Sequence, residues 1–245
     1  MNKTKIMAAI TNSKKEDELF AQAESLRIKA KYKEAVSLYL NAAIIDRNNA
    51  KIYLGLGICY KKQGKTLKAI ETLEKAALLD NNIFETFFEL GCCHLTEENP
   101  CCAIKCFVQA IRLKPENNDA IYHLGLSHEL AQEEEMAMMI YQKLIENSPK
   151  YINAYIRKAK LLMKSELYRQ ALGLLNSAVK INPNYTKIYS AMGYCLDKLG
   201  KTQDAKRYYR KFIKAQPDAT NVTEIKNRIE KLKTPKHANL KFSIV

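Results

Sequence analysis

A single spacing of 34 residues runs through most of this chain and constrains its fold more than any other feature. An alanine returns at this interval without one insertion, at Ala35, Ala69, Ala103, Ala137, Ala171 and Ala205. A small residue keeps the same interval at Ala23, Gly57, Gly91, Gly125, Ala159 and Gly193, and a proline does so at Pro115, Pro149, Pro183 and Pro217. Repetition with a period of about 20 to 50 residues is the signature of proteins built from stacked structural units.

The apolar pattern of each 34-residue unit predicts a pair of amphipathic helices. In the second unit, apolar residues follow helical periodicity over residues 51–63 and again over 67–79. Gly64 separates these two segments, as Gly200 does in the sixth unit. We expect the small residue of the first helix to face the alanine of the second, which lets the two backbones approach closely. Because one helical hairpin cannot bury its apolar face alone, the units must stack on one another.

At these positions the sequence resembles the tetratricopeptide repeat family. The large residue of the family's position 4 is present in all six units, as Leu19, Tyr53, Phe87, Ile121, Tyr155 and Tyr189. The Leu-Gly pair of positions 7 and 8 occurs at Leu56-Gly57, Leu90-Gly91 and Leu124-Gly125. The resemblance implies six helix-turn-helix units, 16–49, 50–83, 84–117, 118–151, 152–185 and 186–219. It predicts an all-α fold, a right-handed superhelical solenoid of six 34-residue repeats.

The two ends of the repeat region depart from the pattern. Arg47 stands where the proline is usual, which suits a terminal unit with one side in water. Apolar residues at helical spacing after residue 219 predict a C-terminal capping helix over 220–233. We expect residues 1–15 to form a polar, mobile lead-in and residues 234–245 a flexible tail. Lys158 occupies the usually apolar position 7 of the fifth unit, so its stem should pack while its ammonium reaches water.

Composition supports a helical, globular protein. Apolar residues make up 47% of the chain and charged residues 27%, and only 8 Gly and 6 Pro are present. These values argue against disorder and against a loop-rich β fold. No apolar stretch is long enough to be a membrane span. The seven cysteines are odd in number and crowded, which is a poor disulfide framework, so we expect a cytoplasmic protein.

Charge is distributed unevenly along the chain. Residues 152–245 hold 20 Lys and Arg against 6 Asp and Glu, whereas residues 1–151 hold 20 of each kind. Within the first part, residues 84–151 carry 5 basic and 11 acidic residues. This asymmetry is typical of a chain whose C-terminal part meets an anionic partner, or of a surface that is merely solvated.

The sequence offers no catalytic or cofactor motif. Gly64-Lys65-Thr66 resembles the end of a phosphate-binding loop, but the required earlier glycine is replaced by Cys59. The same three residues return at Gly200, at the same turn between helices, so a structural turn explains both copies. His94 and His128 share one position of the repeat, which favours packing over catalysis. We therefore predict no catalytic residue, no cofactor and no enzyme activity.

A group of thiols lies within the third unit: Cys92, Cys93, Cys101, Cys102 and Cys106, together with His94. Structural zinc sites usually show Cys-x-x-Cys pairs, and none is present. Adjacent cysteines on one helix also diverge by about 100°. Packed thiols in a reducing compartment are the favoured interpretation, and a metal or redox site is the alternative. The prediction is no metal site.

The resemblance also indicates where a partner would bind. In this family the concave face is lined by first-helix positions 2, 5, 6, 9, 12 and 13. The candidate groove residues at these positions are Phe88, Glu89, Tyr122, His123, Leu126, Arg157, Lys160, Lys187 and Tyr194. The paired Lys and Asn at positions 5 and 9 of chaperone-tail binders are absent. The groove is apolar and acidic in the third and fourth units and basic in the fifth and sixth.

These observations predict a non-catalytic adaptor that binds an extended peptide or a helix of a partner protein. The ligand should carry apolar anchors at one end and carboxylates at the other. The alternative is an anion binder that holds nucleic acid or an acidic membrane surface through the basic C-terminal repeats and the capping helix. This alternative has the charge that it needs but lacks the aromatic stacking motifs of RNA-binding modules.

Overall fold

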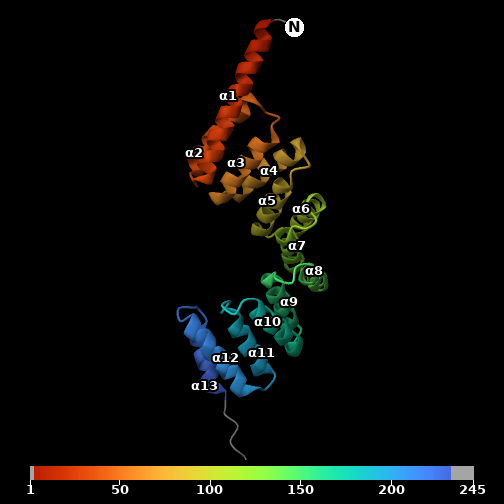
Figure 1. The fold of residues 1–245 in the computed structure, drawn as a ribbon, viewed down its shortest axis with the longest axis vertical. Helices are drawn as coiled ribbons and strands as arrows, with labels where there is room; N and C mark the ends of the chain where they lie inside the picture. Colours follow the sequence, from red (N-terminus) through yellow and green to blue (C-terminus); the bar gives the residue numbers. More distant parts are fainter. Residues whose placement is uncertain (1–2, 233–245) are drawn as a thin grey trace, which may run out of the picture. The chain divides into compact units, whose positions relative to one another are not determined.

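In the computed structural model the backbone is described for residues 3–232 and the side chains for residues 14–232, and over this range the chain is helical without strands (Figure 1). The helices are α1 (Lys3–Ile28), α2 (Tyr32–Ile45), α3 (Ala50–Lys62), α4 (Thr66–Leu79), α5 (Phe84–Thr96), α6 (Pro100–Leu113), α7 (Asn118–Leu130), α8 (Glu134–Asn147), α9 (Ile152–Lys164), α10 (Tyr168–Ile181), α11 (Ile188–Lys198), α12 (Thr202–Ala215) and α13 (Val222–Lys231). The predicted all-α fold of helix-turn-helix repeats is confirmed.

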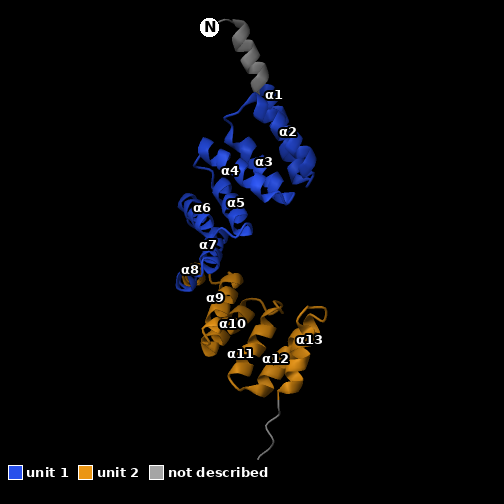
Figure 2. Ribbon diagram, turned by 180° about the vertical axis from the view of Figure 1, so that it is seen from behind, with its two compact units in different colours: residues 1–140 blue, residues 141–245 orange. Residues whose placement is uncertain are grey.

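The chain forms two compact units, residues 1–140 and residues 141–245, and the boundary falls within α8 (Figure 2). In unit 1, α1 packs on α2, α3 on α4 and α5 on α6, and each pair stacks on the next. In unit 2, α9 packs on α10 and α11 on α12, with α13 against α12. No helix between residues 3 and 232 is both long and apolar enough to cross a bilayer.

A large side chain of the second helix lies over the glycine of the first helix in the second, third and sixth repeats. A Cβ placed on Gly57 would lie 2.6 Å from Cγ of Leu73, and one on Gly193 would lie 2.5 Å from Cδ1 of Tyr209. The carbonyl oxygen of Ala69 is farther away, at 3.4 Å. Gly57 therefore faces the backbone of Ala69, as the sequence predicts, and it also faces the side chain of Leu73. The glycine has no side chain, so it leaves room for Leu73, which follows Ala69 by four positions in the second helix.

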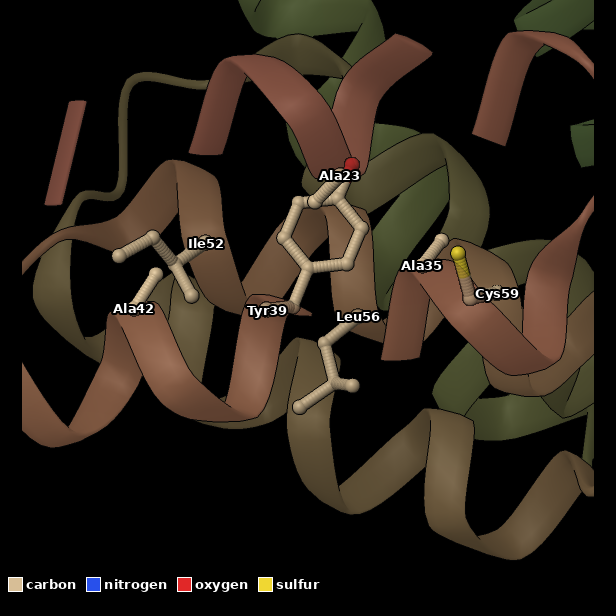
Figure 3. Close-up of a cluster of buried hydrophobic side chains, with 7 residues drawn as sticks. All are labelled: Ala23, Ala35, Tyr39, Ala42, Ile52, Leu56 and Cys59. Carbon is tan, nitrogen blue, oxygen red and sulfur yellow. The ribbon is translucent and has the colours of Figure 1, made fainter. Parts of the chain in front are cut away.

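The first repeat shows how such contacts build a core (Figure 3). Tyr39 is fully buried among Ala23, Ala35 and Ala42 of its own repeat and Ile52, Leu56 and Cys59 of α3. A Cβ on Gly55 of α3 would lie 2.4 Å from Cζ of Tyr39, so this glycine admits the ring between repeats. Tyr39 donates a hydrogen bond to Glu24, which also pairs with Arg27. The core therefore continues from one repeat into the next.

The turn inside every repeat contains one residue in the left-handed region. These residues are Ala30, Gly64, Glu98, Gln132, Glu166 and Gly200, with φ between 53° and 73°, and they follow the 34-residue interval. Only two of the six are glycine, although this backbone conformation costs other residues about 1 kcal/mol or more. The packing of the helix pairs therefore imposes the left-handed conformation on this residue. The type of residue at the position then determines how much the conformation costs.

Polar contacts recur where one repeat meets the next. Tyr155 donates a hydrogen bond to the carbonyl of Pro149 at 3.0 Å, and Tyr189 donates one to the carbonyl of Pro183 at 2.9 Å. Both tyrosines occupy position 4 of their repeat. Lys158 differs from the prediction, because its ammonium donates a hydrogen bond to Gln142 at 2.5 Å and burial lowers its pKa. The ammonium is thus held by a neighbouring helix.

The ends of the chain only partly match the predicted boundaries. α1 begins at Lys3, inside the segment 1–15 that the sequence set apart as a lead-in. α13 lies within the segment 220–233 that was predicted to cap the repeats, and it packs Val222 and Ile225 against α12. Arg228 of α13 donates two hydrogen bonds, of 2.6 and 2.8 Å, to the carboxylate of Asp197 in α11. The predicted tail, 234–245, lies outside the described residues.

The left-handed turn gives a pair of stability predictions. Gln132→Gly should raise the free energy of unfolding by about 1 kcal/mol, because glycine adopts this φ without steric cost. Gly64→Ala should lower it by a similar amount, although a Cβ there meets nothing within 4 Å. Urea denaturation followed by circular dichroism measures both changes. Equal midpoints for the two variants and the parent would contradict the imposed turn.

A second pair of variants separates helix packing from helix propensity. Gly91→Ala should destabilise the protein by about 1–3 kcal/mol, because the new Cβ would lie 2.8 Å from the ring of Phe107. Gly173→Ala adds the same methyl group where nothing lies within 4 Å, so it should stabilise α10 by about 0.5–1 kcal/mol. Thermal melts of the two variants should shift in opposite directions. A shift of the same sign would show that helix propensity alone controls stability.

The ion pair of the capping helix predicts a third effect. The side chain of Asp197 is only 7% exposed, whereas that of Arg228 is 49% exposed. Arg228→Ala should cost about 1–3 kcal/mol, because it leaves a buried carboxylate without its bidentate partner. Arg207→Ala removes a pair in which both side chains are at least half exposed, so it should cost less than about 0.5 kcal/mol. Equal losses for both variants in urea melts would argue against the role of burial.

Candidate functional site

In unit 1 the candidate residues of α5 and α7 form an aromatic cluster. The ring of Phe88 lies 5.9 Å from that of Phe107 and 5.5 Å from that of His123, measured between centroids. His123 stacks on Phe107 and meets Tyr122 edge-on, each at 5.5 Å. Phe88 also stacks on Phe84 at 5.6 Å. The side chain of Phe88 is half-buried against these rings and does not stand alone on the surface.

His123 serves as one of the aromatic rings of this cluster. Burial lowers its pKa, which favours the neutral imidazole. Its Nδ1 atom is buried and has no hydrogen-bond partner among the described residues. A neutral ring between Phe88 and Phe107 contributes apolar and stacking contact.

The acidic residues of this face are partly neutralised by lysines of neighbouring helices. Glu89 accepts a hydrogen bond from Lys61 of α3 at 2.7 Å, and Glu85 accepts one from Lys114 at 2.7 Å. The hydrogen bond from Lys114 lowers the pKa of Glu85. For Lys61, burial lowers the pKa, but the neighbouring Cys92 and Glu89 outweigh it and the pKa is raised. The negative field of the face is therefore weaker than the count of carboxylates implies.

Two thiols of the third repeat, Cys93 and Cys106, are packed in the core. Cys93 is fully buried and Cys106 nearly so, and both belong to one core cluster with Leu73 and Leu90. Burial raises the pKa of Cys93 to about 11 and that of Cys106 to about 12. All the cysteines in the described residues are free thiols. Within the same part of the chain, no group of three or more His, Cys, Asp and Glu residues could hold a metal ion.

Unit 2 contains two adjoining clefts on its first-helix side. The larger, of about 670 Å³, lies between α11 and α13 and includes Tyr194, Lys198 and Ile225 in its lining. The smaller, of about 250 Å³, lies between α9 and α11. The two clefts share three lining residues, Met163, Ser190 and Ala191, so they adjoin, and we refer to them together as the hollow of unit 2.

The candidate basic residues of unit 2 are distributed unequally around this hollow. Lys160 of α9 and Lys187 at the start of α11 both line the smaller cleft, together with Ile156. Tyr194 is 39% exposed in the larger cleft, and the ammonium of Lys198 lies 5.6 Å from its ring centroid. Arg157 is half-buried and is not part of either lining. Lys160 and Lys187 therefore line one cleft, and Arg157 lines neither cleft.

Three further lining residues lie at positions that line the concave face in the resembled family. Met163, Ser190 and Ala191 occupy positions 12, 5 and 6 of their repeats. The wall provided by α13, including Ile225 and Arg228, had no sequence signal beyond the apolar periodicity of the helix. That periodicity predicts that α13 packs on the repeats, but it does not predict that α13 also lines a cleft.

The histidines that resembled catalytic residues are packing residues. His94 is 8% exposed, and burial lowers its pKa. His128 is largely buried and its Nδ1 lies 2.6 Å from a carboxylate oxygen of Glu133 in the following turn. Gly64 and Gly200 both have φ of 73° in equivalent turns, which explains the recurrence of Gly-Lys-Thr as a structural feature.

Comparison with protein families places three segments in one family. A family model described as tetratricopeptide repeat matches residues 50–83 and 186–219, and a second model with the same description matches residues 119–151. No curated protein matches the sequence.

Solved structures of the same fold cover most of the chain. MamA is 28% identical, with a TM-score of 0.64 over 67% of this chain and 96% of that one. PilF of Pseudomonas aeruginosa is 15% identical, with a TM-score of 0.72 over 89% and 99%. YrrB, described as a TPR protein with an unusual peptide-binding site, is 19% identical, with a TM-score of 0.62 over 77% and 97%. The three matched segments are therefore tetratricopeptide repeats, and 50–83 and 186–219 coincide with two of the predicted 34-residue units.

Proposed function

We propose that this protein is a non-catalytic scaffold that binds an extended peptide or a helix of a partner protein in the hollow of unit 2. The observation that carries the proposal is the pair of clefts of about 670 and 250 Å³ that share Met163, Ser190 and Ala191. A hollow that follows successive first helices suits a ligand that is long and narrow. Stacked helical repeats commonly bind their partners on such a surface.

The lining chemistry favours a ligand with both apolar and acidic side chains. Ile156, Met163 and Leu175 offer apolar contact in the smaller cleft, and apolar anchors in pockets carry much of the energy of binding. Lys160 and Lys187 line the same cleft and can contact carboxylates as point charges. Methionine adapts its shape to different side chains, which suits a site for peptides.

The face of unit 1 contributes less charge than the sequence suggested. The sequence analysis describes the groove of the third and fourth units as acidic, but Glu85 and Glu89 each pair with a lysine. Phe88 and His123 pack on each other, which leaves Tyr122 and Leu126 as the remaining half-buried apolar candidates. The preference for carboxylates is therefore assigned to unit 2, and the direction of the ligand stays a prediction.

The comparisons support a role in protein binding. The fold is shared with YrrB, whose description names a peptide-binding site.

Selection from a library of random peptides tests this function directly. Peptides that bind the immobilised full chain should combine acidic and aliphatic residues, and calorimetry should show that Lys160→Gln/Lys187→Gln weakens the best of them about tenfold. The double variant should also flatten the salt dependence of binding.

The matched control is Lys180→Gln/Lys201→Gln, which removes the same charge from exposed positions of unit 2 outside both clefts. This control should bind the selected peptides as the parent does. No enrichment of peptides, or equal binding by both double variants, would show that the hollow is not the peptide site.

A further inference from the structure

The outward face of α12 carries a stripe of basic side chains. Arg207, Arg210, Lys211 and Lys214 follow one another at intervals of three, one and three residues, and all four are exposed. With about 100° of rotation per residue, they share an arc of about 100° on one side of the helix. The opposite side consists of Ala205, Tyr209 and Phe212, which are buried.

The repeat fold does not require these charges. The four positions are numbers 22, 25, 26 and 29 of the sixth repeat, and the same positions can be compared in the others. They hold Ser37, Leu40, Asn41 and Ile44 in the first repeat, Glu71, Glu74, Lys75 and Leu78 in the second, and Lys105, Val108, Gln109 and Arg112 in the third. They hold Met139, Gln142, Lys143 and Glu146 in the fourth and Gly173, Asn176, Ser177 and Lys180 in the fifth. Only the sixth repeat is basic at all four.

Little negative charge offsets the stripe within α12. The helix contains five basic residues and one acidic residue, Asp204. Asp204 pairs with Arg207 at 3.2 Å, and both side chains are at least half exposed. Arg210 and Lys214 form no ion pair with any residue between 14 and 232. The stripe is therefore a concentrated positive surface that attracts polyanions.

Two tyrosines lie beside the stripe. The rings of Tyr189 and Tyr208 come from α11 and α12, and their centroids are 6.1 Å apart. The ammonium of Lys211 lies 5.3 Å from the Tyr208 centroid and 5.7 Å from that of Tyr189. The hydroxyl of Tyr189 donates a hydrogen bond to the carbonyl of Pro183, which fixes the orientation of that ring. Both side chains are half-buried, so each ring keeps an exposed part.

We propose that this basic aromatic face, defined by Arg207, Arg210, Lys211, Lys214, Tyr189 and Tyr208, binds single-stranded nucleic acid. Cations that follow the phosphates and aromatic rings on which bases stack are the two elements of sequence-independent single-strand binding. The stripe is about 10 Å long, from the helical rise per residue, which is enough for about three phosphates of one strand. The face lies on the second-helix side of the sixth repeat and is separate from the residues that line the clefts.

The surface suits nucleic acid better than a bilayer. Binding to an interface requires exposed apolar side chains that enter the acyl region. The exposed large hydrophobic residues in the described part of unit 2 are Leu167 and Tyr194, and neither belongs to α12. The apolar side of α12 is occupied by the core of the unit.

Fluorescence anisotropy with a labelled oligouridine of about 20 nucleotides tests the proposal on the full chain. Arg210→Gln/Lys211→Gln should weaken binding at least about tenfold at low salt. It should also reduce the slope of log K against log salt by about 1.4, which corresponds to two lost phosphate contacts. Lys62→Gln/Lys65→Gln removes the same charge from exposed positions of unit 1 and should change binding less than twofold. Circular dichroism melts would verify that both double variants remain folded.

A second variant tests the aromatic part of the face. Tyr208→Leu keeps an apolar side chain against the core but removes the ring, so it should weaken oligouridine binding about tenfold. It should leave binding of a duplex of the same length nearly unchanged, because paired bases cannot stack on the ring. Equal loss for both probes would refute single-strand recognition.

Other outcomes would overturn the proposal in different ways. No binding of oligouridine by the parent chain would refute the proposal. Equal loss in the two double variants would show that net charge alone is at work. Binding of phosphatidylserine vesicles or of polyglutamate, without binding of oligouridine, would reassign the face to a membrane or to an acidic protein. Loss of oligouridine binding in Lys160→Gln/Lys187→Gln would place the nucleic acid in the clefts instead of on α12.

Discussion

The packing of the second, third and sixth repeats depends on the close approach of two helices at one glycine. Gly57, Gly91 and Gly193 each lie under a large residue of the second helix, at distances that admit no Cβ without movement. A side chain of that size fills the space between the helices and reaches the following repeat, as Tyr39 does over Gly55. Because interiors are close-packed, this contact fixes the distance between the helices and hence the register of each repeat.

The sequence predicted most of the fold because the residues that form this contact recur at a fixed interval. It also predicted the capping helix from apolar periodicity alone. It missed the left-handed turn as a general feature, since Ala30, Glu98, Gln132 and Glu166 occupy it without being glycine. It did not predict that Leu73 lies even closer to Gly57 than Ala69 does, because periodicity gives the face of a helix but does not determine which of its side chains lies nearest.

The candidate site was less accessible to sequence reasoning. Positions within a repeat identified the first-helix face, but they could not show that Phe88 would pack on His123 or that Glu89 would pair with Lys61. Such contacts join residues of different repeats, and they depend on the rotamers that side chains adopt after stacking. The clefts of unit 2 likewise arise between helices and depend on the placement of α13.

The buried positions of a repeat determine its packing, so its exposed positions are free to vary. One repeat can therefore present two different surfaces. In the sixth repeat, the first helix presents Ser190, Ala191 and Tyr194 to a cleft, while the second presents cations on its outer side. Like charges three and four residues apart on a helix repel by about 0.2–0.5 kcal/mol per pair. Burial of Phe212 and Tyr209, worth about 1.5–3 kcal/mol for each large apolar side chain, exceeds that repulsion. The helix can therefore hold its charges close together in the absence of a ligand, and a polyanion that neutralised them would further stabilise the fold.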